Sequence, residues 1–124
     1  MLSIGRFGTN DLERARKFYD AIAGILGAKR VTDTPTVIGY KGPSGGLFLI
    51  GRPFAGYATV GNGTQLGFYV ESRAIVDALH AKALELGGKD EGPPGMRGPE
   101  SYRFYACYFR DLDGNKLNAV ALQA

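Results

Sequence analysis

Hydrophobic positions recur at three- and four-residue intervals in two segments, which predicts two amphipathic helices. The first helix is expected to be capped by Asn10 and to end at Gly27. The second is expected to be capped by Ser72 and to end at Gly87-Gly88. Each helix therefore has one apolar stripe, which must be buried against another element.

Short apolar segments lie on both sides of each helix and predict strands. The clearest alternation puts Leu66 and Phe68 on one face and Gln65 and Tyr69 on the other. One strand precedes each helix and three follow it, so the chain repeats the order β-α-β-β-β. The expected strands are residues 2–7, 29–32, 36–40 and 47–50, then 64–70, a weak strand near residue 89, 104–110 and 115–122.

This internal repeat predicts the fold class, which is α+β with two tandem β-α-β-β-β modules. Neither module can bury both faces of its strands alone, so we expect a curved sheet around a cleft with the helices outside. Module one is assigned to residues 1–55, the link to 56–63 and module two to 64–124, within a single domain. The irregular segment 92–101 is a candidate rim or lid of the cleft.

The amino-acid composition argues against several classes of protein. The chain has 124 residues, 44% of them hydrophobic and 22% charged, which is typical of one globular domain. No apolar run approaches the length of a membrane span. The net charge of +3 is spread among acidic residues and does not indicate nucleic acid binding. A single cysteine and the lack of a secretory signal favour the cytoplasm.

Two sequence motifs resemble one known family. They are Gly8-Thr9-Asn10-Asp11-Leu12-Glu13-Arg14-Ala15 with Phe18-Tyr19, and Tyr108-Phe109-Arg110-Asp111-Leu112-Asp113-Gly114-Asn115-Lys116. They resemble the opening helix and the "D-P-D-G-N" hairpin of the glyoxalase, bleomycin-resistance and extradiol-dioxygenase superfamily, also called vicinal oxygen chelate proteins. Leu112 stands where the hairpin usually has proline. With the module repeat, the resemblance covers the full length.

The resemblance implies a cleft, a homodimer and, in the enzymes, a divalent metal held by residues of several strands. The corresponding positions here are Ile4, the run 47–50, Gln65 and Asn118, and none is a histidine or carboxylate. Two neutral amides do not offset the desolvation of a divalent ion. We therefore expect no metal and no other cofactor.

The predicted ligand-binding residues follow from strand alternation and from their place near the loop. Arg6, Gln65, Tyr69 and Asn118 are expected on the cleft face, although Arg6 could instead pair with an acid at the rim. Two further residues are expected to close or wall the pocket, namely Arg97 and Tyr105. Alternation leaves open which half of the cluster 102–105 faces inward.

Two other residues have reactive side chains but are expected to be structural. His80 is the only histidine and follows the core position Leu79, which predicts a surface side chain without partner ligands. Cys107 lies within a strong strand, where a free thiol is usually a small buried apolar group.

The preferred functional hypothesis is a metal-free, glyoxalase-like protein that binds a polar or anionic small molecule. The alternative is a lactoylglutathione lyase-like or dioxygenase-like enzyme in which Arg6, Gln65 and Asn118 stabilise an oxyanion. Glu100 is the best available base for such an enzyme. A third possibility is a module that acts by association with a partner protein.

Overall fold

The computed structural model describes residues 1–123 and contains two modules with the same order of elements. Ala124, the end of the expected second module, lies outside the described residues. Module one contains β1 (Ile4–Gly8), α1 (Leu12–Leu26), β2 (Lys29–Asp33), β3 (Val37–Lys41) and β4 (Leu47–Gly51). Module two contains β5 (Leu66–Tyr69), α2 (Arg73–Glu85), β6 (Lys89–Met96), the 3-10 helix η1 (Glu100–Tyr102), β7 (Tyr105–Arg110) and β8 (Lys116–Ala121).

Each module forms a four-stranded mixed sheet, in the order β1-β4-β3-β2 or β5-β8-β7-β6. In both, the first strand pairs in parallel with the last, and the other neighbours are antiparallel. The α+β class and the tandem β-α-β-β-β modules are therefore confirmed. One detail differs from the expectation of a single curved sheet: β1 and β5 are both edge strands, so the modules contribute two sheets.

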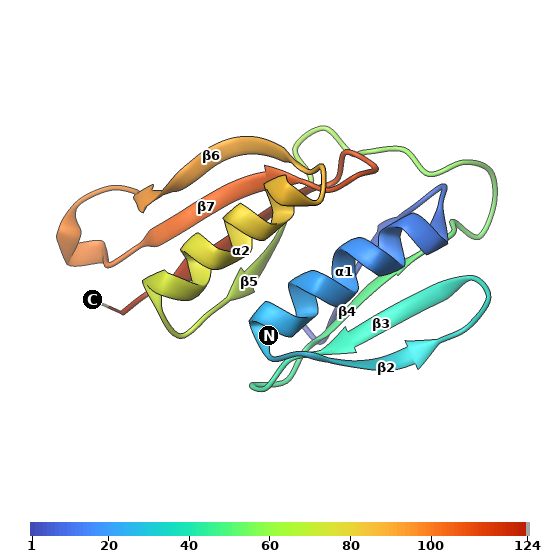
Figure 1. The fold of residues 1–124 in the computed structure, drawn as a ribbon, viewed down its shortest axis with the longest axis horizontal. Helices are drawn as coiled ribbons and strands as arrows, with labels where there is room; N and C mark the ends of the chain where they lie inside the picture. The colour runs from blue at the N-terminus through green and yellow to red at the C-terminus, as the bar shows by residue number, and fades with distance from the viewer. Residues whose placement is uncertain (124) are drawn as a thin grey trace.

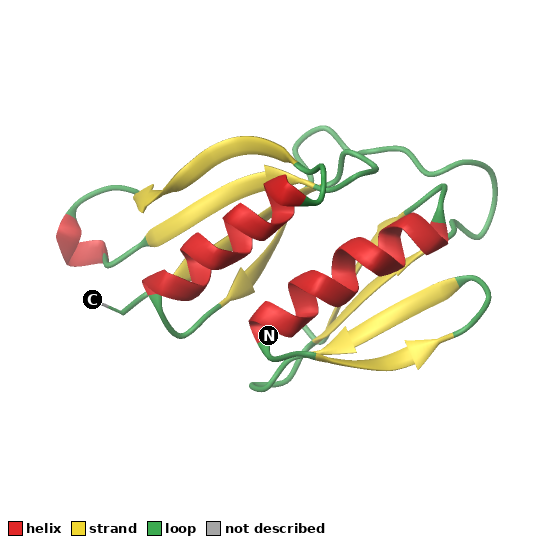
Figure 2. Cartoon of the chain, in the orientation of Figure 1, coloured by secondary structure: helices red, strands yellow, loops and turns green. Residues whose placement is uncertain are grey.

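The two helices lie side by side and cover the same side of the paired sheets (Figure 1). Figure 2 shows the resulting two layers, helices on one side and strands on the other. Buried apolar residues of both modules form one continuous core between the layers. The rings of Phe48 and Phe68 join the modules with centroids 5.3 Å apart. Neither helix within residues 1–123 has the length and hydropathy that a membrane crossing requires.

The start of α1 differs from the sequence prediction. The N-cap is Asp11, whose carboxylate accepts from the backbone N–H of Arg14 at 3.0 Å. Asn10 does not cap the helix because its side-chain amide exchanges two hydrogen bonds with the backbone of Ala58, in the link. Two other caps are as predicted: Gly27 adopts the left-handed conformation after α1, and Ser72 accepts from Ile75 at the start of α2. At the end of α2 the C-cap is Leu86, one residue before the predicted Gly87.

The expected irregular loop at 92–101 is largely ordered strand and helix. Strand β6 continues through Pro93 and Pro94 to Met96, and η1 follows. Proline lacks the N–H that an interior strand must donate, but β6 is the outer strand of its sheet and has a partner on one side only. Two register shifts against β7 accompany the prolines. The prediction of an irregular loop is therefore wrong for residues 92–96, which belong to β6.

His80 is buried and not on the surface, contrary to the sequence prediction. It is 7% exposed, and its Nε2 lies 2.9 Å from Oδ1 of Asp90 on β6. Helix α2 contacts β6 as well as β7 and β8, so a wider face of the helix is covered than its apolar stripe alone indicates. The imidazole can occupy that face because the carboxylate gives it a hydrogen-bonding partner.

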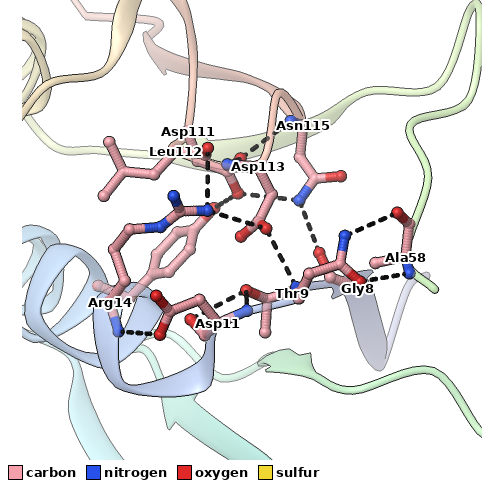
Figure 3. Close-up of polar contacts among 11 residues, drawn as sticks. Gly8, Thr9, Asp11, Arg14, Ala58, Asp111, Leu112, Asp113 and Asn115 are labelled. Carbon is pink, nitrogen blue, oxygen red and sulfur yellow. Dashed lines mark hydrogen bonds and ion pairs between the residues drawn. The ribbon is translucent and has the colours of Figure 1, made fainter.

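The two motifs that carry the family resemblance meet in space at the junction of the modules (Figure 3). The carboxylate of Asp111, in the β7–β8 hairpin, accepts hydrogen bonds from the phenol of Tyr19 and from the side-chain amide of Asn115. It also accepts from the backbone N–H groups of Asp113 and Asn115, each at 2.9 Å. The amide of Asn115 in turn donates to the carbonyl of Gly8 at 3.0 Å.

A second set of contacts surrounds this buried carboxylate. Asp113 accepts from the backbone N–H of Asn10 at 3.1 Å and lies 3.3 Å from a guanidinium nitrogen of Arg14. That guanidinium also donates to the carbonyl of Leu112 (Figure 3). Both motifs therefore hold module one to module two. We refer to this network of residues 8–19 and 111–115 as the clasp.

Candidate functional site

The candidate site lies on the face of the second sheet that is turned away from the helices, which we call the open face of module two. Strand register places Gly67, Asn118, Tyr108 and Gly92 in one row across all four strands. Neighbouring positions of β8 alternate as predicted: Leu117 and Ala119 are fully buried toward the helices. The row thus has an amide and a phenol at its centre and a glycine at each end.

The first glycine makes room for the amide. A Cβ on Gly67 would lie 2.4 Å from Oδ1 of Asn118, so any larger residue would displace that side chain. The same Oδ1 accepts a hydrogen bond from Nε2 of Gln65 at 3.3 Å. The structure therefore brings together Gln65 and Asn118, two of the residues that the sequence singles out. Asn118 is 7% exposed, which fixes its amide more firmly than that of the exposed Gln65.

The second glycine makes room for a guanidinium. A Cβ on Gly92 would lie 3.1 Å from Nη2 of Arg97 and 3.2 Å from the ring of Tyr108. The guanidinium folds back over that ring, 5.4 Å from its centroid, and donates to the carbonyl of Pro93 at 2.7 Å. The ammonium of Lys116 lies 5.7 Å from the same centroid. Tyr108 therefore holds two cations beside the amide pair.

A hollow of about 630 Å³ adjoins this group at the end nearest the link. Arg110 and Lys116 line it together with Gln65. Arg110 is paired with Glu91, because its Nε donates to that carboxylate at 2.7 Å. This contact holds the pKa of the Glu91 carboxyl below its usual range. Lys116 forms no ion pair within residues 1–123. The hollow thus presents one unpaired cation and one paired cation beside an amide.

The open face of module one differs in chemistry. Ile4 and Arg6 on β1 lie opposite Leu47 and Leu49 on β4. The row of Ile4 and Leu47 continues to Lys41 on β3, so this face combines apolar side chains with cations. Arg6 donates to the backbone carbonyl of Arg52 at 2.8 Å. The structure therefore places Arg6 on a different sheet from Gln65 and Asn118, against the start of the link.

The two predicted tyrosines lie on opposite faces. Tyr69 shares the open face with Gln65 and is 52% exposed. Tyr105 has the other orientation: its phenol donates to Asp77 of α2 at 2.7 Å, and Arg73 lies over its ring at 5.1 Å. The structure therefore separates Tyr105 from the other candidates, because it shares its face of β7 with the buried Cys107.

Sequence reasoning missed Tyr108 and Lys116. Both could have been found from the short turn at residues 111–114, since a tight hairpin fixes which residues of β7 and β8 are opposite each other. The observed register pairs Tyr108 with Asn118 and Arg110 with Lys116. Once Asn118 is assigned to the open face, these partners must share it.

The residues at the family's metal-ligand positions do not fit a divalent ion. Ile4 and its neighbour Leu47 supply only hydrocarbon, while Gln65 and Asn118 supply two neutral amides that bind each other. Within residues 1–123 no group of three or more histidine, cysteine, aspartate or glutamate side chains is close enough to hold a metal. Zinc, nickel, iron and manganese sites need several imidazole, thiolate or carboxylate ligands.

The candidate base of the enzymatic alternative lies elsewhere. A carboxylate oxygen of Glu100 accepts from Arg73 of α2 at 3.0 Å. Arg73 also lies over Tyr105, which faces the helix layer. Glu100 is therefore tied to a different face from Gln65 and Asn118 and does not serve as their base in this geometry.

Comparison with known proteins agrees with the two-module fold and the clasp motifs. A sequence model of the Glyoxalase/Bleomycin resistance protein/Dioxygenase superfamily matches residues 4–119. The chain belongs to this superfamily. No curated protein matches the sequence. The assignment rests on a match that includes both modules and both clasp motifs.

The structure of this superfamily member is similar to solved structures of other proteins. A glyoxalase/bleomycin resistance protein from Albidiferax ferrireducens is 41% identical, with 98% of each chain covered and a TM-score of 0.88. A lactoylglutathione lyase from Agrobacterium tumefaciens is 21% identical, with 98% of this chain and 92% of that chain covered and a TM-score of 0.68. The second likeness concerns the fold alone.

Proposed function

We propose that this superfamily member is a small-molecule binding protein that works without the family's metal and holds a polar or anionic ligand on the open face of module two. The observation that carries the proposal is the arrangement of Gln65, Asn118, Arg97 and Lys116 around Tyr108. Amides and cations with fixed positions recognise a carboxylate or phosphate by charge-assisted hydrogen bonds. The adjoining hollow has room for such a ligand.

The side chains at the site favour ligand binding without catalysis. The amide pair and the two cations donate hydrogen bonds or carry charge, but none is a general base at neutral pH. Within residues 1–123, the one histidine is buried against Asp90 on the helix side. The site therefore has what is needed to hold an anion, and it lacks an obvious group to take a proton from it.

We further propose that the protein is a homodimer. Phe54 and Tyr57 in the segment between the modules are 108% and 89% exposed, which is unusual for aromatic side chains without a partner surface. The open face of module one also carries an exposed apolar side chain, that of Ile4. Sedimentation of the wild type and of a Phe54→Ser, Tyr57→Ser double variant tests this: the wild type is expected to be dimeric and the variant monomeric.

The binding proposal is tested by calorimetric and NMR titration with benzoate and inorganic phosphate. We expect saturable binding by at least one of them, with changes in the side-chain amide signals of Gln65 and Asn118. Lys116→Met should weaken it about tenfold or more, since it removes an unpaired cation. Lys29→Met, on the outer strand β2, is the matched control and should leave the affinity within about twofold.

Gly67→Ala provides a steric test of the same site. The added methyl group should displace the Asn118 amide and abolish binding, with the fold retained as judged by the NMR spectrum. No binding of either anion by the wild type, or equal binding by Lys116→Met, would overturn the proposal. Robust turnover of methylglyoxal with glutathione, or a stoichiometric metal ion after dialysis against zinc and nickel, would contradict the metal-free assignment.

A further inference from the structure

A second hollow lies at the junction of the modules, between the edge strands β1 and β5. Helix-side residues such as Phe48 and open-face residues such as Ile4 and Gln65 both line it. It has a volume of about 350 Å³. The second half of α1 forms one wall with Ile22 and Ala23, and β5 forms another with Leu66 and Phe68. We call it the junction pocket. The central side chains of the anion site, Tyr108, Arg97 and Lys116, are not among its lining residues.

The fold leaves the junction pocket unfilled because small residues meet there. Strands β1 and β5 form no ladder, and a Cβ on Gly5 would lie 2.9 Å from a methyl group of Leu66. Ala23 presents only a methyl group from α1, and the rim at residues 42–46 is mostly glycine. Larger side chains at these positions would close the space.

One wall of the junction pocket is aromatic. The ring of Tyr19 lies 5.0 Å from that of Phe48, which lies 5.3 Å from that of Phe68 in an edge-to-face arrangement. Three rings from two modules thus form a continuous surface. Aromatic ligands pack well against such walls, because offset and edge-to-face pairs add to the burial of apolar area.

The lining residues exclude a charged ligand. None of the residues that line the junction pocket carries a charge. The phenols of Tyr19 and Tyr40 line it, but they already donate to Asp111 and Asp20. The other polar side chains of the lining, among them Gln65 and Tyr69, are neutral. An anion or cation would lose its hydration there without a charged partner in exchange. A neutral molecule has no such penalty.

We propose that the junction pocket is a binding site for a neutral aromatic molecule of one or two rings. The volume is at the lower end of the range for small-molecule sites, which sets the size limit. Gln65 lines both hollows, but the inference does not depend on the cations of the anion site, because neither Arg97 nor Lys116 lines the junction pocket. One chain can therefore hold two kinds of ligand.

NMR titration of the wild-type protein with indole tests the proposal. We expect saturable binding with a Kd below about 1 mM, and with shifts centred on Ala23, Leu66 and Phe68. Indole-3-carboxylate, which is anionic, should not bind in this pocket. Lys116→Met should leave the affinity for indole unchanged, which separates failure of this proposal from failure of the anion site.

The matched comparison is between a variant that fills the junction pocket, which we call a plug variant, and a variant at the next residue of the same helix. Ala23→Leu fills the pocket and should weaken indole binding about tenfold or more. Gly24→Leu adds a larger side chain at the next position of α1, where a Cβ meets nothing within 4 Å, and should bind like the wild type. Should Ala23→Leu fail to fold, Ala28→Leu is a second plug at a half-buried lining position.

Three results would overturn the proposal. They are the absence of saturable binding, shifts confined to residues that do not line the junction pocket, and equal binding by a folded plug variant. Binding of indole-3-carboxylate with the same shifts would also contradict it, since the argument rests on an uncharged lining.

Discussion

The phenol of Tyr19 on α1 donates a hydrogen bond to the carboxylate of Asp111, 92 residues further along the chain. Both side chains are buried, and burial raises the pKa of each group. The hydrogen bonds from Tyr19 and Asn115 act in the opposite direction on Asp111. This contact lies at the centre of the clasp and joins the modules through a satisfied polar network within an apolar core.

Removing the carboxylate should destabilise the protein more than removing the phenol. Asp111→Ala leaves the Tyr19 hydroxyl and several N–H groups without an acceptor, which should lower the free energy of unfolding by about 3–5 kcal/mol. Tyr19→Phe removes one hydrogen bond to a charged group, worth about 1.5–3 kcal/mol. Urea unfolding measures both values.

The matched control for the clasp is an exposed ion pair. Asp33 is half exposed and pairs with Arg16, so Asp33→Ala should change stability by less than about 1 kcal/mol. If Asp111→Ala proved no more destabilising than Asp33→Ala, the clasp would not be holding the modules together.

The fold could be predicted from the sequence because its signals are local and repeated. Helical periodicity, Ser72, Gly27 and the tight hairpin each specify an element by themselves. The prediction that Asn10 caps α1 is wrong because its side chain forms hydrogen bonds with the backbone of Ala58 in the link. A local sequence pattern does not contain such a tertiary contact. The prediction that His80 is a surface residue is wrong for the same reason, since its partner Asp90 lies on another element.

Residues of the candidate site can be predicted only where the sequence shows which face of a strand is buried. Gln65 directly precedes β5 and Asn118 lies in β8, and the alternation of apolar residues along these two segments identifies both positions. Tyr105 follows η1, and the sequence does not define the phase of the strand that begins there. The sequence predicts that Arg97 closes over the site from an irregular loop, but in the structure it packs on Tyr108, where Gly92 leaves space for it.

Cys107 should be chemically silent in the folded protein. Burial raises the pKa of its thiol to about 11, and the Sγ atom lies 3.8 Å from the carbonyl of Val76 beneath α2. Since the thiolate is the reactive form, native protein at pH 8 should react with Ellman's reagent about 100-fold or more slowly than protein in urea. The chain has a single cysteine, so one rate describes one site. Fast stoichiometric labelling of the native protein would show that α2 opens readily from β7.

The carboxylate of Asp90 should make stability depend on acid pH. The backbone N–H of Gly92 and then the imidazole of His80 hold the pKa of Asp90 below its usual range. A lowered folded-state pKa contributes stability that is present above the unfolded value near 4 and is lost as pH falls through the folded value. Asp90→Asn should therefore have a lower Tm than the wild type at pH 6–7, and the difference should shrink below about pH 4. Glu71→Gln, at an exposed position, is the control, and a Tm difference for Asp90→Asn that stayed constant from pH 7 to pH 2 would contradict this linkage.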